Sequence, residues 1–168
     1  FIFSKAKNEV TKLNARSSVM DLVSGYGFAR QGYPVRGLFS IPFVGLSSNG
    51  IPMYNINGKI TSTDIDFQTR DNIDYLKYEG PTDPTITGSF GNIFTYKAFK
   101  LNVFITYSFG NVVRLNPCFN YQYSDLSSMP REFKNRWTVP GDEKHTNIPA
   151  IISKRQYEDN KDLMYAYN

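Results

Sequence analysis

The clearest pattern in the chain is an alternation of apolar and polar side chains between residues 86 and 110. In its second half every other residue is apolar, namely Leu101, Val103, Ile105, Tyr107 and Phe109. The residues between them are mostly small or polar, with Phe104 as the exception. A period of two is typical of a β-strand with one apolar face.

A similar segment precedes this one. Phe90, Phe94 and Tyr96 share a face with Asn92, and the pattern indicates that the opposite face holds Gly88, Ser89, Gly91 and Thr95, with Ile93 among them. Only Lys97–Lys100 separates the two segments, which is enough for a tight turn and too short for a crossover helix. We therefore predict an antiparallel hairpin. Arms of about ten residues are typical of transmembrane barrel strands, although a soluble β-sandwich can produce the same alternation.

The first third of the chain carries weaker patterns. Residues 1–15 begin as the end of a strand, and residues 19–23 fit one helical turn that Gly25 ends. Pro34 and Pro42 cannot donate to a central ladder. Any strand in residues 33–45 is therefore expected to be bent, bulged or at a sheet edge.

Turn dipeptides punctuate the middle of the chain. Asn49-Gly50 and Asn57-Gly58 favour hairpin turns, so two small hairpins are expected on an exposed loop. After the main hairpin, residues 127–149 are polar and rich in proline, which indicates a long loop. The mixed-charge run 154–162 predicts a solvated turn or a short helix.

Composition excludes few classes of protein. The 168 residues are enough for one domain, and 19 basic against 15 acidic residues give a net charge of +4. Because the lysines are spread among acidic residues, no nucleic-acid interface is expected. A single cysteine, Cys118, excludes an internal disulfide. No run of 18 apolar residues predicts a transmembrane helix.

Catalytic chemistry is not indicated. The single histidine, His145, stands in a polar loop with no cysteine nearby, so no metal site is predicted. Cys118 is expected to be a packed side chain, and Asp64 and Asp66 to be solvated rather than acid–base or calcium groups. We therefore expect no enzyme and no cofactor.

A series of short motifs runs in a fixed order through about residues 26–149. The central one follows the pattern G-x-x-x-P-x-x-x-G-G-F-x-N-x-F-x-Y-K-x-F-x-L-x-V, starting at Gly80, with Ser89 in place of its second glycine. The flanking matches are Gly32-Tyr33-Pro34-Val35, Gly45-Leu46, Gly50-Ile51-Pro52, Arg136-Trp137-Thr138 and Pro140-Gly141-Asp142. Together they resemble the C-terminal barrel region of the SusC/RagA family of TonB-dependent outer-membrane transporters.

The resemblance implies an all-β fold, with antiparallel strands that form part of an outer-membrane β-barrel wall and long extracellular loops. Barrels of this kind have about 22 strands and a plugged lumen. Residues 1–168 would be a partial segment of such a barrel, without the plug, the TonB box or a signal peptide. Residues 46–72 and 115–155 are the expected extracellular loops, and the Lys97–Lys100 turn is expected to be short and periplasmic.

The family's function is nutrient import in the cell outer membrane. The implied partners are TonB, a SusD-like surface lipoprotein, outer-membrane lipid and a glycan or peptide substrate. Weak candidates for substrate or partner contact are Tyr121, Tyr123, Arg136 and Trp137, because aromatic rings and guanidinium groups suit such contacts. Arg136-Trp137 could instead anchor the loop. The alternative functions are a soluble carbohydrate-binding β-sandwich and an adhesin-like surface domain.

Overall fold

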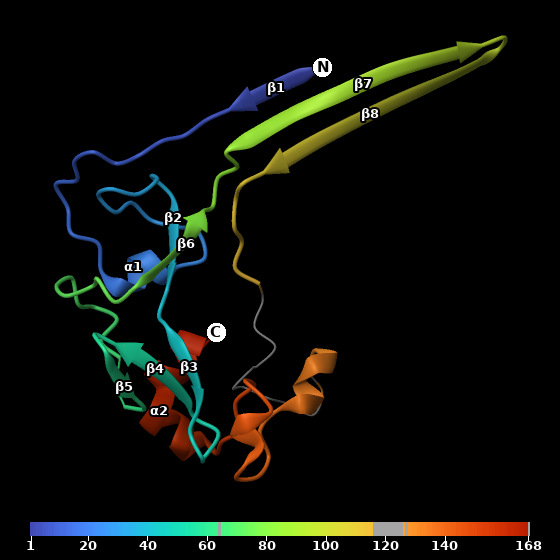
Figure 1. Ribbon diagram of the computed structural model, residues 1–168. Coiled ribbons are helices and arrows are strands. Elements are labelled where there is room, and N and C mark those ends of the chain that lie inside the picture. The colour runs from blue at the N-terminus through green and yellow to red at the C-terminus, as the bar shows by residue number, and fades with distance from the viewer. Residues whose placement is uncertain (64, 116–125, 127, 168) are drawn as a thin grey trace. The chain divides into compact units, whose positions relative to one another are not determined.

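The computed structural model describes residues 1–63, 65–115, 126 and 128–167, and it divides into two compact units (Figure 1). The hairpin unit comprises Phe1–Ser17, Asp21–Phe39 and Tyr78–Val113. The meander unit comprises Ser18–Met20, Ser40–Lys77 and Arg114–Asn168. Antiparallel β-structure predominates and helices are few, as the sequence predicts. No described helix is long and apolar enough to cross a membrane.

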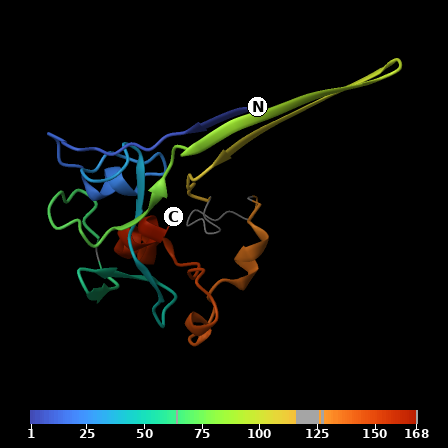
Figure 2. The same ribbon diagram turned by 45° about the horizontal axis from the view of Figure 1, so that its top comes forward.

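The hairpin unit contains a sheet with the strand order β1-β7-β8. β7 (Ile86–Tyr96) and β8 (Phe99–Phe109) pair without a break over their whole length, from Ile86 opposite Phe109 to Tyr96 opposite Phe99 (Figure 1, Figure 2). β1 (Ile2–Lys5) pairs antiparallel with the start of β7. Both the hairpin and the strand at the start of the chain are thus confirmed.

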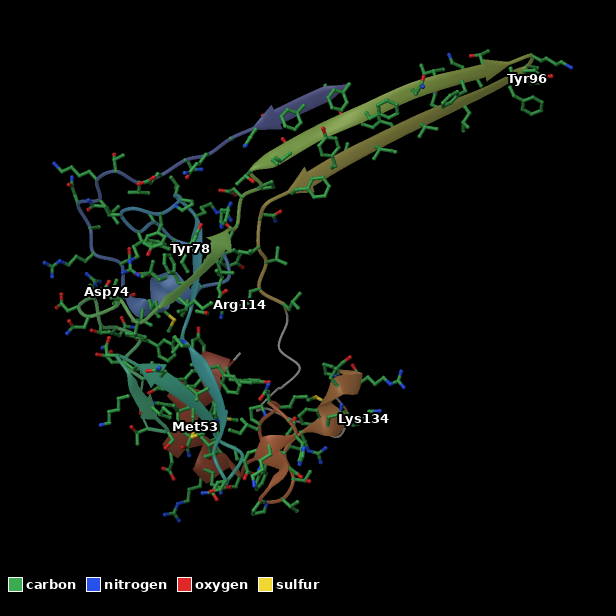
Figure 3. The ribbon with its side chains drawn as sticks, in the orientation of Figure 1. Met53, Asp74, Tyr78, Tyr96, Arg114 and Lys134 are labelled. Carbon is green, nitrogen blue, oxygen red and sulfur yellow. The ribbon has the colours of Figure 1, made fainter. Side chains whose placement is uncertain are left out.

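The turn of the hairpin is tighter than expected. β8 begins at Phe99, so only Lys97 and Ala98 connect the strands, and Lys97 adopts a positive φ of 50°. Two-residue connections with positive φ match the right-handed twist of the flanking strands, which explains the short link. Tyr96 lies at this end of the hairpin (Figure 3).

The two faces of the hairpin differ as the alternation predicts, with one correction. Gly88, which was expected on the polar face, lies on the apolar face because it pairs with Tyr107 in an unbroken register. A Cβ at Gly88 would overlap both the Ile2 carbonyl oxygen and the Tyr107 side chain. The missing side chain lets the Tyr107 hydroxyl donate to the Ile2 carbonyl oxygen at 3.3 Å.

Aromatic packing organises the rest of the hairpin unit. β2 (Gly37–Ser40) and β6 (Lys77–Pro81) form a two-stranded sheet. The ring centroids of Tyr33, Phe39 and Tyr78 lie 4.9–5.4 Å apart, and the Arg30 guanidinium lies 5.3 Å from the Tyr33 ring centroid. Burial raises the pKa of the Tyr78 hydroxyl, with a smaller contribution from Tyr33.

The meander unit contains a second antiparallel sheet. Its strands are β3 (Phe43–Leu46), β4 (Pro52–Ile56) and β5 (Lys59–Thr61), in sequence order. Asn57 and Gly58 have φ of 52° and 82°, as their hairpin turn requires. The two small hairpins are confirmed. The expected bulge lies in β3, where the register shifts between Phe43 and Gly45.

These hairpins are not simply an exposed loop. Tyr54 of β4 is 1% exposed, and its hydroxyl donates to the Leu163 carbonyl oxygen at 3.0 Å. Burial, and then the nearby Tyr167, raise the pKa of Tyr54 far above its ordinary value. The core of the meander unit also contains Leu46, Ile65, Phe67, Leu76, Phe133, Ala150 and Met164.

The helix that supplies Leu163 is longer than the short element expected at 154–162. α2 (Lys154–Tyr167) begins at a capping box, in which the Ser153 hydroxyl accepts from the Gln156 N–H and Gln156 Oε1 accepts from the Ser153 N–H. The helix kinks at Asn160, where φ is −128°. Its first half is exposed and charged, whereas its second half buries Leu163 and Met164. The run of charges therefore marks only the solvated half. Of the remaining elements, α1 (Val19–Val23) confirms the expected helical turn.

Candidate functional site

Trp137 joins two distant parts of the meander unit. Its backbone N–H donates to the Ile148 carbonyl at 2.9 Å, and the Ala150 N–H donates to the Gly50 carbonyl at 3.0 Å. A Cβ at Gly50 would lie 2.7 Å from the indole Cδ2 and 2.6 Å from the Ala150 Cβ. The indole ring therefore rests on the backbone of the β3–β4 turn. These contacts favour the interpretation that Trp137 anchors its loop.

A carboxylate also fixes the indole, through a hydrogen bond to its ring N–H. Glu143 Oε2 accepts from the Trp137 Nε1–H at 3.1 Å and from the Gly141 N–H at 2.8 Å. The Glu143 backbone N–H, the Gly141 N–H and the indole lower the pKa of this carboxyl. Since the indole N–H is already bonded, Trp137 can offer a ligand its ring but not its donor.

The neighbouring carboxylate closes the same loop. Asp142 belongs to η2 (Asp142–Lys144), and its Oδ2 accepts from the Thr138 N–H at 3.0 Å, the Thr138 hydroxyl at 2.8 Å and the Val139 N–H at 3.1 Å. The two backbone N–H groups, followed by the hydroxyl, lower the pKa of Asp142. The loop that carries Trp137 is therefore held by charge-assisted hydrogen bonds.

Arg136 makes a different set of contacts. It follows η1 (Arg131–Asn135), and its guanidinium carbon lies 5.1 Å from the centre of the Phe133 ring. The Arg136 backbone is extended, with φ −62° and ψ 160°. Arg136 lines a groove of about 420 Å³, whereas Trp137 lines another of about 590 Å³. Ile151 lines both grooves. Arg136 and Trp137 thus face two adjoining grooves instead of one shared pocket.

No protein-family model matches this chain, and no curated protein sequence matches it.

The remaining sequence candidates separate into two groups. Tyr121 and Tyr123 lie outside the described residues, as do Asp64 and Cys118. His145 is exposed, and its backbone N–H donates to the Asp142 carbonyl at 2.8 Å. Within the described parts of the chain, no three His, Cys, Asp or Glu side chains are grouped as metal ligands would be.

Sequence reasoning missed most of the groove beside Trp137. This groove is lined by hydroxyl, amide and aliphatic side chains from the β3–β4 turn, from Ser62, from the segment before α2 and from α2 itself: Ser47, Ser48, Asn49, Ile51, Ser62, Ile152, Gln156 and Asn160. Only the Ser153–Gln156 capping-box spacing could have indicated where α2 begins. Nothing in the sequence indicates that α2 and the β3–β4 turn lie together.

Proposed function

We propose that this chain contributes wall strands and outward-facing loops to an outer-membrane nutrient importer of the SusC/RagA type. One observation carries the proposal. β7 and β8 are 11 residues each, and they present one mostly apolar face and one mostly small, polar face. Strands of about 9–11 residues with apolar-out, polar-in alternation are the pattern of a transmembrane barrel.

The distribution of ring side chains on the apolar face supports the same proposal. Tyr96 and Phe99 pair beside the turn, and Tyr107 and Phe109 stack near the opposite end, with centroids 5.8 Å apart. Between these ends the face includes the aliphatic residues Leu101, Val103 and Ile105 together with Phe90, Asn92 and Phe94. Barrels in membranes carry aromatic girdles at both interfaces of an apolar band.

In this proposal the apolar face contacts lipid and the polar face lines the lumen. Lys97 and Ala98 form a periplasmic turn, because periplasmic turns in such barrels are short. Residues 46–72 and 115–155 are then extracellular loops, which a SusD-like lipoprotein and a glycan or peptide substrate would contact. Coupling to TonB would need parts of the family's architecture that residues 1–168 do not include.

A soluble sandwich competes with this proposal. In a sandwich, a second sheet would cover the apolar face. Among the described residues, most side chains of this face stay exposed, from 45% for Phe90 to 79% for Phe99. Large bare apolar surfaces of this kind mark a face that meets another apolar phase or partner. Contact with lipid therefore accounts for this exposed apolar face better than contact with water does.

The test is the behaviour of the native protein during extraction. We expect it to fractionate with outer membranes, to require detergent for solubility and to resist SDS until heated, as closed barrels do. Recovery in the aqueous fraction without detergent would contradict the proposal. If that detergent-free protein also bound glycans, a carbohydrate-binding sandwich would replace it.

A further inference from the structure

Three basic side chains gather around η1. Arg131 and Lys134 are three residues apart in a 3₁₀-helix, so they lie above one another on one side of it. The Arg136 N–H donates to the Phe133 carbonyl at 3.2 Å, which keeps Arg136 next to η1. All three line the groove of about 420 Å³, and Figure 3 marks Lys134 on this segment.

Within the described part of the chain, no carboxylate pairs with these three basic groups. Among the described residues, neither Arg131 nor Lys134 nor Arg136 forms an ion pair with a carboxylate. The acidic residue of η1, Glu132, is exposed and does not line the groove. Like charges on one face of a helix repel each other. An anion in the groove would remove this repulsion.

The groove also has a fixed apolar part. Met129, Phe133 and Ile151 line it beside the basic groups. Phe133 is buried against Met164 of α2, which holds η1 in place. A planar guanidinium and a fixed apolar surface together suit a carboxylate carried on a ring with an apolar side.

The described residues that line the adjoining groove carry no charge. They supply hydroxyl and amide groups and the Trp137 indole, and none of them is Lys, Arg, Asp or Glu. Hydroxyl and amide groups exchange hydrogen bonds with sugar hydroxyls, and a ring face packs on the apolar side of a sugar. A ligand that crosses Ile151 would therefore meet neutral polar groups on one side and cations on the other.

We infer that the two grooves bind an acidic oligosaccharide. The carboxylate of a uronic acid residue lies at Arg131, Lys134 and Arg136, and the uncharged part of the chain lies beside Trp137. This inference rests on the proposed import function and names the class of its substrate.

The experiment is a binding titration of the purified, detergent-solubilised full-length protein by isothermal titration calorimetry. The probes are an oligogalacturonate and its methyl ester, which lacks the negative charge and carries one added methyl group on each carboxyl. We expect the acid to bind at least about tenfold tighter, since a charge-assisted contact adds more than 1.4 kcal/mol. Added salt should reduce this preference.

A triple variant, Arg131→Gln, Lys134→Gln and Arg136→Gln, should lose the preference and keep the affinity for the ester. The matched control, Lys154→Gln, Arg155→Gln and Lys161→Gln, removes the same charge from α2 and should keep the preference. A circular-dichroism spectrum like that of the unmodified protein would show that the triple variant is folded.

Equal affinity for acid and ester, or an equal loss in the control variant, would overturn the inference. So would binding of acidic peptides or anionic lipid vesicles in place of the saccharide. Fractionation separates this inference from the proposed function. An outer-membrane protein that ignores charge refutes only the inference, whereas a water-soluble protein that prefers the acid refutes only the importer.

Discussion

The hairpin of β7 and β8 differs from the sheet of β3, β4 and β5 in how far its aromatic side chains are exposed. Phe99 on the hairpin is 79% exposed, whereas Tyr54 on β4 is 1% exposed. The hairpin has the more regular apolar alternation, and the meander unit has the more polar, turn-rich sequence. The more apolar pattern therefore belongs to the less buried sheet.

This difference shows what alternation encodes. A period of two fixes which residues share a face, but it does not state what covers that face. In the meander unit the chain itself supplies the cover, because α2 places Leu163 and Tyr167 near Tyr54. For the hairpin, the described residues supply no comparable cover, and the proposal assigns that role to lipid.

The largest expected effect comes from removing the buried ring. Tyr54→Ala should destabilise the meander unit by about 3–5 kcal/mol, as the loss of a buried aromatic side chain usually does. Phe99→Ala, the control on the hairpin, should change its stability by less than about 0.5 kcal/mol. Denaturant titrations followed by circular dichroism measure both. Similar effects of the two substitutions would remove the contrast between the regions.

A charge on the apolar face should come next. Ile105→Lys should cost about 2–4 kcal/mol in the bilayer if this position lies near the midplane, because lysine is poorly solvated there. Thr106→Lys, on the opposite face, should cost much less. The measurement is the folding equilibrium of the full-length barrel in lipid vesicles. Unchanged stability of the Ile105 variant would refute lipid contact at that position.

A smaller effect is expected at the turn that supports Trp137. Gly50 has a φ of +71° and no room for a Cβ between Trp137 and Ala150. Gly50→Ala should therefore cost about 2–3 kcal/mol through backbone strain and overpacking. Gly58→Ala meets no neighbour within 4 Å, so it isolates the strain of a positive φ alone. If the two variants lose equal stability, the indole does not depend on Gly50.

The smallest expected effect is a dependence on pH. The pKa values of Asp142 and Glu143 are lower in the folded loop than their ordinary values of 3.8 and 4.5. Their hydrogen bonds therefore stabilise the loop fully above those ordinary values, and this stability is lost as the pH falls through the lower, folded values.

Indole N–H exchange of Trp137 should therefore accelerate as the pH falls below about 4, once the intrinsic pH dependence is subtracted. Glu143→Gln should remove much of this response, whereas Glu158→Gln on the exposed part of α2 should leave it in place. A response that persists in Glu143→Gln would assign it to other groups.

Much of the local structure could be predicted from the sequence. The alternation specified the partner strands of the hairpin, and Asn57-Gly58 specified a turn, because both depend on neighbouring residues alone. Gly88 was assigned to the polar face because it is small. All even-numbered residues of β7 share one face, however, so Gly88 lies with Phe90 and Phe94 on the apolar side.

The candidate site was less predictable. Arg136 and Trp137 are adjacent in sequence and were both weak candidates for substrate or partner contact, but nothing in the sequence indicated that each would line its own groove. The anchoring of Trp137 depends on Gly50 and Glu143, and the uncharged groove depends on α2. Contacts between residues so far apart in sequence produce no hydrophobic pattern that a single sequence could reveal.

The central claim, that the apolar face of the hairpin meets lipid, is tested most directly by two neighbouring labels. Single cysteines at Ile105 and Thr106, in full-length protein with Cys118 and every other native cysteine replaced by serine, would each carry a fluorophore in vesicles that contain brominated lipid. The account predicts strong quenching by the lipid at residue 105 and weak quenching at residue 106, with water-soluble quenchers showing the reverse. Equal quenching at both positions, or access of water-soluble quenchers to residue 105, would contradict it.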